Sequence, residues 1–206
     1  MQRTIKAILP PKRPGTQTTL ILDDGTTKKI LPQVAAERGL FSGMELSETE
    51  FADLEKANSA ASAKARAVRI ISAASVSKRD LERRLTEKGE TPEDAQNAVR
   101  WLAALKLLDD AETARQIVAR GAARGYGTER IKQTLWEKRI PKQYWDEALE
   151  TLPDMTEALE SFLRSRLGEE PDEKTLRSAA QAAARRGFTW SEIHEALERI
   201  EKTVDE

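Results

Sequence analysis

The stretch that decides the fold runs from Gly125 to Leu149 and reads GYGTERIKQTLWEKRIPKQYWDEAL. It opens with a Gly-Tyr-Gly turn, and Thr128 is predicted to cap the helix that follows. Ile131 and Leu135 lie one turn apart on one face of that helix. Pro141 predicts its end, because the residue before a proline disfavours helical backbone angles. A second helix then carries an apolar stripe at helical spacing, formed by Trp145, Ala148, Leu149 and Leu152.

The same pattern occurs three times, with a period near 48 residues. The break between the two helices recurs as Gly89-Glu90-Thr91, Arg139-Ile140-Pro141 and Gly187-Phe188-Thr189. A further apolar helix precedes each pair, so each unit is predicted to have three helices. A repeat of this length indicates stacked units that share a hydrophobic core. The matching apolar residues are Leu81, Leu85, Ala95, Ala98, Val99 and Leu102 in the first repeat, and Ala179, Ala183, Ile193, Ala196, Leu197 and Ile200 in the third.

A small α/β module precedes the repeats. Asp24-Gly25 between two β-prone runs predicts a hairpin, and Ser47 with Glu50 forms a capping-box pattern for a helix expected to end near Asn58. Ser59 to Ala63 is either a linker or the start of a long helix. The predicted fold is mainly α: tandem three-helix repeats in an elongated, curved array behind this module. The expected segments are residues 1–58, 63–108, 109–153 and 154–202.

The composition argues against catalysis. The chain has no cysteine and a single histidine, His194, so a thiolate or multi-histidine metal site and a histidine-based triad are not expected. Asp109-Asp110 is interpreted as a helix cap, because no second group accompanies it that could complete a metal or acid–base site. No phosphate-binding loop or nucleophile elbow is found. We therefore expect a protein that is not an enzyme and holds no cofactor and no metal.

Basic residues concentrate in the middle of the chain. Residues 61–150 carry 18 basic and 14 acidic groups, whereas the whole chain has a net charge of −1. Pairs such as Arg120 and Arg124 place like charges one helical turn apart, which costs a few tenths of a kcal/mol. An anionic partner would offset that cost, although solvated arginine is the simpler interpretation of charge alone.

The aromatic residues are interpreted mainly as packing residues. Trp145 falls on the repeated stripe and is expected in the core, while Trp101 and Trp136 lie one position off a stripe and are expected to seal boundaries between repeats. Trp190 is expected to be partly exposed. Trp190 or Tyr126 could instead stack on a nucleic-acid base, which is the less favoured interpretation.

Several of these residues together resemble the signature of the bacterial RecX proteins, which are tandem three-helix-repeat regulators of the RecA recombinase. The departures are Glu112-Thr113-Ala114, where the family usually has an aromatic residue, and Glu90 in the first break. Asp24-Gly25 and Gly43-Met44-Glu45-Leu46 resemble the N-terminal extension of longer members. The residues that carry the resemblance are Leu107-Leu108-Asp109-Asp110, Arg120, Gly125-Tyr126-Gly127, Ile131, Leu135, Lys138 and Ile140.

From its composition the chain is expected to be cytoplasmic, and it is expected to be a monomer. The resemblance implies that it binds the groove of a RecA filament on single-stranded DNA. It would inhibit strand exchange, alter the ATPase cycle or destabilise the filament, and direct DNA binding would be weak. No membrane partner is expected, and the residues leave the role of the N-terminal module open. The residues expected to contact the filament are Arg79, Arg83, Arg84, Arg120, Arg124, Tyr126, Arg130, Lys132 and Arg139.

Two other functional classes remain open from the sequence. Each helix–break–helix unit could imitate a helix-turn-helix that binds duplex DNA directly, with polar residues at the start of its second helix. Lys142 and Gln143 fit such a reader in the second repeat, but Glu93 and Asp94 in the first would repel phosphate. A structural scaffold without a DNA role is the third class.

Overall fold

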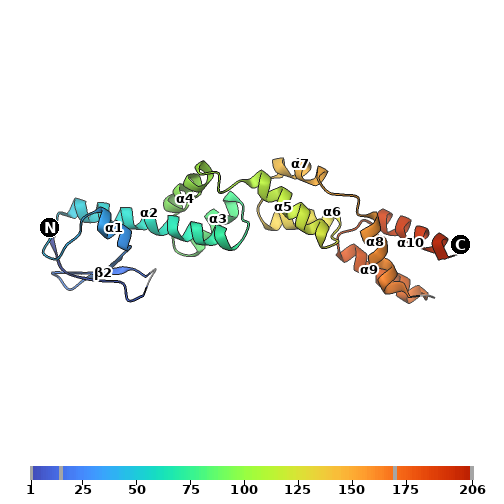
Figure 1. The fold of residues 1–206 in the computed structure, drawn as a ribbon, viewed down its shortest axis with the longest axis horizontal. Helices are drawn as coiled ribbons and strands as arrows, with labels where there is room; N and C mark the ends of the chain where they lie inside the picture. Colours follow the sequence, from blue (N-terminus) through green and yellow to red (C-terminus); the bar gives the residue numbers. More distant parts are fainter. Residues whose placement is uncertain (1, 14–15, 169–170, 205–206) are drawn as a thin grey trace. The chain divides into compact units, whose positions relative to one another are not determined.

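The structure, a computed structural model, describes residues 2–13, 16–168 and 171–204. The chain is mainly helical and carries a small antiparallel sheet near its N-terminus, as Figure 1 shows. It divides into two compact units. The first contains Met1–Ala74 and Leu81–Leu108, and the second contains Ser75–Asp80 and Asp109–Glu206.

The sheet of the first unit has four antiparallel strands in the order β3-β2-β1-β4. The predicted hairpin joins β2 and β3, and Gly25 takes the left-handed conformation at its turn with a φ of 82°. The short fourth strand was not predicted. The strands are β1 (Arg3–Leu9), β2 (Thr18–Leu22), β3 (Thr27–Ile30) and β4 (Glu45–Leu46).

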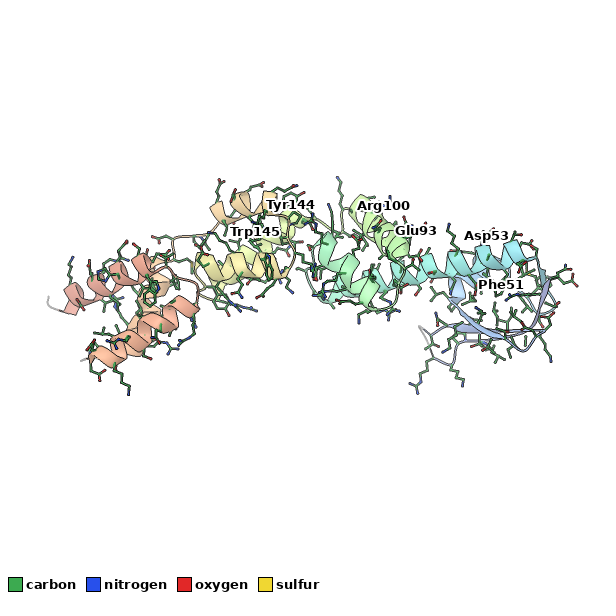
Figure 2. All side chains as sticks on the ribbon, turned by 180° about the vertical axis from the view of Figure 1, so that it is seen from behind. Phe51, Asp53, Glu93, Arg100, Tyr144 and Trp145 are labelled. Atoms are coloured by element: carbon green, nitrogen blue, oxygen red, sulfur yellow. The ribbon has the colours of Figure 1, made fainter. Side chains whose placement is uncertain are left out.

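One face of the sheet packs on helices α1 (Pro32–Glu37) and α2 (Glu48–Ala73). Ile5 and Leu20 are fully buried in this core together with Phe51, which Figure 2 shows extending from α2. The predicted capping box begins α2, because Glu50 N donates to Ser47 Oγ at 3.2 Å and Ser47 N donates to the Glu50 carboxylate at 2.8 Å. The hydrogen bond from the Ser47 backbone lowers the pKa of Glu50. The sheet and this helix therefore stabilise each other.

The expected end of this helix near Asn58 is wrong, because α2 continues without a break for 26 residues. The alanine-rich stretch that suggested a linker favours helix, and Ala63 is fully buried. Asn58 does not end the helix; its side chain accepts a hydrogen bond from Leu31 N at 2.8 Å and donates to Lys29 O at 3.1 Å. One helix thus serves both the N-terminal sheet and the first repeat.

The first repeat continues with α3 (Lys78–Glu87) and α4 (Pro92–Ala104). Its expected inward residues, including Leu81, Leu85 and Leu102, are fully buried. Helix α4 packs against α2. Thr91 caps α4, since its hydroxyl accepts a hydrogen bond from Asp94 N.

The second unit holds the other two repeats, each with its own hydrophobic core. The second repeat comprises α5 (Asp110–Ala123), α6 (Thr128–Glu137), the short 3-10 helix η1 (Lys142–Tyr144) and α7 (Trp145–Glu150). The third comprises α8 (Thr156–Leu167), α9 (Glu173–Arg185) and α10 (Trp190–Val204). Thr189 and Glu192 cap α10 reciprocally, because Glu192 N donates to Thr189 Oγ1 at 3.3 Å and Thr189 N donates to the Glu192 carboxylate at 2.6 Å.

Glycines join the second repeat to the third. Gly127, and not Thr128 as predicted, is the N-cap of α6, and it has no side chain to offer. Gly127 N donates to Arg186 O at 2.9 Å, and Glu129 N donates to Gly187 O at 3.1 Å. A Cβ on Gly127 would lie 2.3 Å from Gly187 O. The start of α6 is therefore capped by the backbone of the next repeat, which approaches too closely for any side chain.

The break after the second helix has the same conformation in all three repeats. Gly89, Arg139 and Gly187 have positive φ angles of 90°, 55° and 91°. The N–H of the following residue bonds back to the helix it leaves, for example Ile140 N to Leu135 O at 3.0 Å. This left-handed ending satisfies free helix carbonyls. The residue after it is buried each time: Glu90, Ile140 and Phe188.

Candidate functional site

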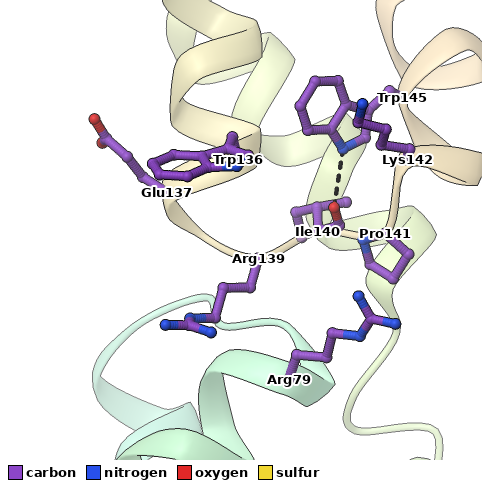
Figure 3. A pocket seen from close by; sticks show the side chains of 8 residues that line it. All are labelled: Arg79, Trp136, Glu137, Arg139, Ile140, Pro141, Lys142 and Trp145. Atoms are coloured by element: carbon purple, nitrogen blue, oxygen red, sulfur yellow. Dashed lines mark hydrogen bonds between the residues drawn. The ribbon is translucent and has the colours of Figure 1, made fainter.

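A cavity of about 470 Å³ lies at the break of the second repeat, within the second unit (Figure 3). Three cations and one carboxylate line it, together with two tryptophans. In the view of Figure 3 the two arginines lie on one side of the break and the two indole rings on the other. The lining residues are Arg79, Trp136, Glu137, Arg139, Ile140, Pro141, Lys142 and Trp145.

The break itself aims its side chains in opposite directions. Ile140 is 4% exposed and packs in the core of the second repeat. Arg139 before it and Lys142 after it are exposed at the cavity. Trp145 Nε1 donates to Ile140 O at 3.0 Å, which fixes the indole against the break. The buried isoleucine and this hydrogen bond anchor the segment, and the cations on either side of Ile140 are left at the surface.

Arg79 is brought to the cavity from the start of α3. Ser77 is fully buried, and its hydroxyl donates to Lys138 O at 2.7 Å. Lys78 N donates to the Asp110 carboxylate at 2.8 Å. The two carboxylates of the Asp-Asp pair thus cap different helices: Asp109 accepts from the first N–H groups of α5, as predicted, and Asp110 accepts from the start of α3. These bonds place Arg79 beside the break.

Trp136 is the exposed aromatic surface of this cavity. It is 69% exposed, so the expectation that it seals a boundary between repeats is wrong. Its position on α6 lies between the buried Leu135 and the solvated Glu137. An indole face beside guanidinium and ammonium groups can stack on a planar group while the cations bind an anion. The cavity therefore suits a ligand that is both flat and negatively charged.

Of the nine residues predicted for the filament contact, the structure brings Arg79 and Arg139 together in the cavity. Arg120 donates to Ser75 Oγ at 2.7 Å and to Gln116. Arg124 is exposed, and its carbonyl accepts from Arg186. Arg130 bonds Gln133, and Lys132 pairs with Glu129 at 2.9 Å, both within α6.

The three remaining predicted residues lie outside the cavity. Tyr126 is half-buried against the core of the second repeat, which favours the packing interpretation. Arg83 pairs with Glu87 along α3, and Arg84 is half-buried on the same helix.

Sequence reasoning did not include Trp136, Lys142 and Trp145 in the site. The available signal was a tryptophan one position off the apolar stripe and close to three cations in the chain. Across the described ranges, no cluster of three or more metal-binding side chains is found.

The comparisons with known proteins agree on one family. Residues 109–149 match the family model described as RecX, second three-helix domain. The Regulatory protein RecX of Xanthomonas campestris pv. campestris is 36% identical over 120 residues, which cover 57% of this chain and 74% of that relative. The chain belongs to the RecX family. The Regulatory protein RecX of Cronobacter sakazakii is 32% identical over 93 residues, which cover 40% of this chain and 56% of that relative.

Solved structures of RecX proteins share the fold. A crystal structure of regulatory protein RecX aligns with a TM-score of 0.64 at 23% identity, over 95% of this RecX-family chain and 99% of the other. RecX from Lactobacillus salivarius aligns with a TM-score of 0.62 at 16% identity, over 70% of this chain and 98% of the other. No helix in the described part of the chain is long and apolar enough to cross a membrane.

Proposed function

We propose that this protein regulates the RecA recombinase by binding the RecA filament on single-stranded DNA. It inhibits strand exchange and lowers filament stability or ATPase activity, and it performs no catalysis of its own. The observation that carries the proposal is the cavity where Arg79, Arg139 and Lys142 surround the exposed Trp136. Membership of the RecX family supports it.

The cavity matches the chemistry of a nucleoprotein filament. Bases of single-stranded DNA can stack on an exposed indole at about 1–3 kcal/mol each. Guanidinium and ammonium groups bind the neighbouring phosphates, or carboxylates on a protein surface. Glu137 also lines this cavity and keeps its net charge modest, so this cavity alone binds naked DNA weakly and the filament supplies further contacts.

The alternative of direct duplex reading fits less well. Asp94 at the start of α4 is buried, and it bonds Thr91 and Ser59. Because its carboxylate already accepts these hydrogen bonds, Asp94 cannot contact a base edge. It would also place negative charge beside phosphate. The helices that follow the breaks therefore do not form an equivalent set of DNA-reading helices.

The proposal is tested by RecA-dependent ATP hydrolysis and strand exchange on single-stranded DNA with substoichiometric amounts of the full chain. We expect inhibition by the wild type. Trp136→Ala combined with Arg139→Glu should weaken inhibition at least tenfold, because both the stacking face and a phosphate contact are lost.

Matched controls separate a specific loss from a general one. Trp190 is 63% exposed and Arg185 is exposed, and both lie in the third repeat away from the cavity. Trp190→Ala with Arg185→Glu removes the same side-chain types and should leave inhibition within twofold of wild type. The proposal would be refuted if the two double variants weakened inhibition equally, or if the wild type did not inhibit RecA at all. A shift of duplex DNA without RecA that depends on its base sequence would favour the direct reader.

A further inference from the structure

A second, more strongly cationic cavity lies in the first unit, between the β-sheet and α2. Its volume is about 600 Å³. Five basic side chains line it, and among the residues that the structure describes no carboxylate does. Lys12 and Arg13 come from the β1–β2 connection, Lys29 from β3, and Arg66 with Arg69 from α2.

Hydrogen bonds between the sheet and α2 hold the walls in place. Asn58 on α2 bonds both Leu31 N and Lys29 O, so the end of β3 is fixed against the helix. Arg66 Nε donates to the Glu90 carboxylate at 2.6 Å, and that carboxylate is 6% exposed. These bonds fix the end of β3 and the Arg66 side chain at two of the cavity's walls.

Most of these charges have no counter-charge. Among the described residues, no carboxylate forms an ion pair with Lys12, Arg13, Lys29 or Arg69. The neighbouring Lys28 shows the contrast, because it pairs with Glu55 on α2. Like charges gathered around one cavity repel each other, and within a Debye length of about 8–10 Å salt does not fully screen them. A bound anion offsets this repulsion.

The other lining groups identify the class of anion. Thr16 and Thr19 add hydroxyls to the wall, and arginine, lysine and threonine are the side chains that contact the phosphates of nucleic acids. None of the described residues that line this cavity is aromatic, which distinguishes it from the cavity of the second repeat. Stacking on bases is thus not provided here, and binding depends on the backbone alone.

We propose that this cavity binds the phosphate backbone of DNA without regard to base sequence. The N-terminal module then has a role of its own: it gives the first unit a DNA contact that does not involve RecA. This inference goes beyond the proposed regulation, because it concerns naked DNA and a different unit of the chain.

The test measures binding of the full chain to a fluorescein-labelled oligo-dT by anisotropy, without RecA, at several NaCl concentrations. The variant Lys29→Gln/Arg69→Gln neutralises two exposed cations of the cavity. We expect its affinity to fall about tenfold, and the slope of log K against log salt to lessen by about 1.4, since each contact to single-stranded phosphate contributes about 0.7.

The control Arg38→Gln/Lys56→Gln removes two exposed cations of the same unit that do not line the cavity. It should keep the wild-type affinity and slope, and a mixed-sequence oligonucleotide should bind like oligo-dT. Equal slopes for the two double variants would overturn the proposal. So would competition by poly-glutamate as effective as that by unlabelled oligo-dT at equal charge, because it would indicate a carboxylate-binding surface. Binding of tripolyphosphate with no binding of oligo-dT would rule out DNA as the ligand.

The same titration distinguishes this inference from the proposed regulation. Arg139→Glu lies in the other unit and should leave the change caused by Lys29→Gln/Arg69→Gln unaltered. If Arg139→Glu loses RecA inhibition but keeps its binding of oligo-dT, both proposals stand, because the two cavities lie in different units. Absence of RecA regulation in the wild type would leave the DNA result standing.

Discussion

The breaks of the first and second repeats share a backbone but differ in every side chain. Gly89 and Arg139 both have a left-handed φ and both donate to the carbonyl three residues earlier, at 2.9 Å in each case. The first break then buries Glu90, bonded to Arg66, and starts its next helix with the Thr91 cap. The second buries Ile140 and continues with Pro141.

The difference indicates which break serves only the fold. Glycine takes a left-handed conformation at no steric cost, whereas another residue pays roughly 1–2 kcal/mol. The second repeat keeps an arginine in that conformation, and its side chain lines the cavity beside Trp136. Backbone strain tends to be retained where the side chain is needed for function. We propose that Arg139 is such a residue.

The largest expected effect concerns the glycine of the third break. A Cβ on Gly187 would lie 2.2 Å from Arg130 N, whereas one on Gly89 would meet nothing within 4 Å. Gly187→Ala should therefore lower the free energy of unfolding by about 3 kcal/mol or more, and Gly89→Ala by about 1 kcal/mol. Urea denaturation followed by circular dichroism measures both. Similar losses in the two variants would show that the repeats are not joined through Gly187.

The next effect concerns the buried acid of the first break. Glu90→Ala removes the partner of Arg66 and of the Ser62 hydroxyl. The free energy of unfolding should therefore fall by about 2–3 kcal/mol. Replacing both members, as in Glu90→Ile with Arg66→Leu, imitates the apolar second break and should recover most of that loss. A double-mutant cycle by thermal unfolding measures the coupling. If the double variant is less stable than Glu90→Ala, the two breaks are not interchangeable in this way.

The smallest effect is a gain. Arg139→Gly relieves a positive φ of 55°, so the free energy of unfolding should rise by up to about 1 kcal/mol, while inhibition of RecA weakens. Lys106 is the matched control, since its φ is 57° and its N–H bonds Ala103 O at the end of α4 in the same manner. Lys106→Gly should give the same stabilisation and leave inhibition unchanged. If both variants lose inhibition of RecA, the inhibition does not depend specifically on the Arg139 side chain in the cavity.

Much of the architecture was predictable because local signals set it. The helical period placed Leu135 and Ile193 in their cores, and Asp-Gly and Ser-x-x-Glu patterns marked the hairpin and the start of α2. The errors occurred where a local signal had two meanings. A run of alanines suits a linker or a helix, and Thr128 suits a cap or a first helical turn.

The site was only half predictable, since its residues come from distant parts of the chain. Cationic clustering identified Arg79 and Arg139, but no pattern in the sequence shows that Ser77 bonds a carbonyl 61 residues away and brings them together. Exposure of Trp136 likewise follows from how α6 packs on its neighbours, which a one-position offset in the stripe does not determine.

The sequence by itself determined the triplicated three-helix unit, the side-chain caps of α2, α4, α5 and α10, and the hairpin, because these depend on residues three to four apart along a helix or on opposite sides of a turn. Tertiary structure alone decided that Gly127 meets Gly187, that α2 serves two modules, and that cations gather around two separate cavities. Those outcomes depend on packing between segments far apart in the chain. Such packing produces no periodic pattern in the sequence from which it could be predicted.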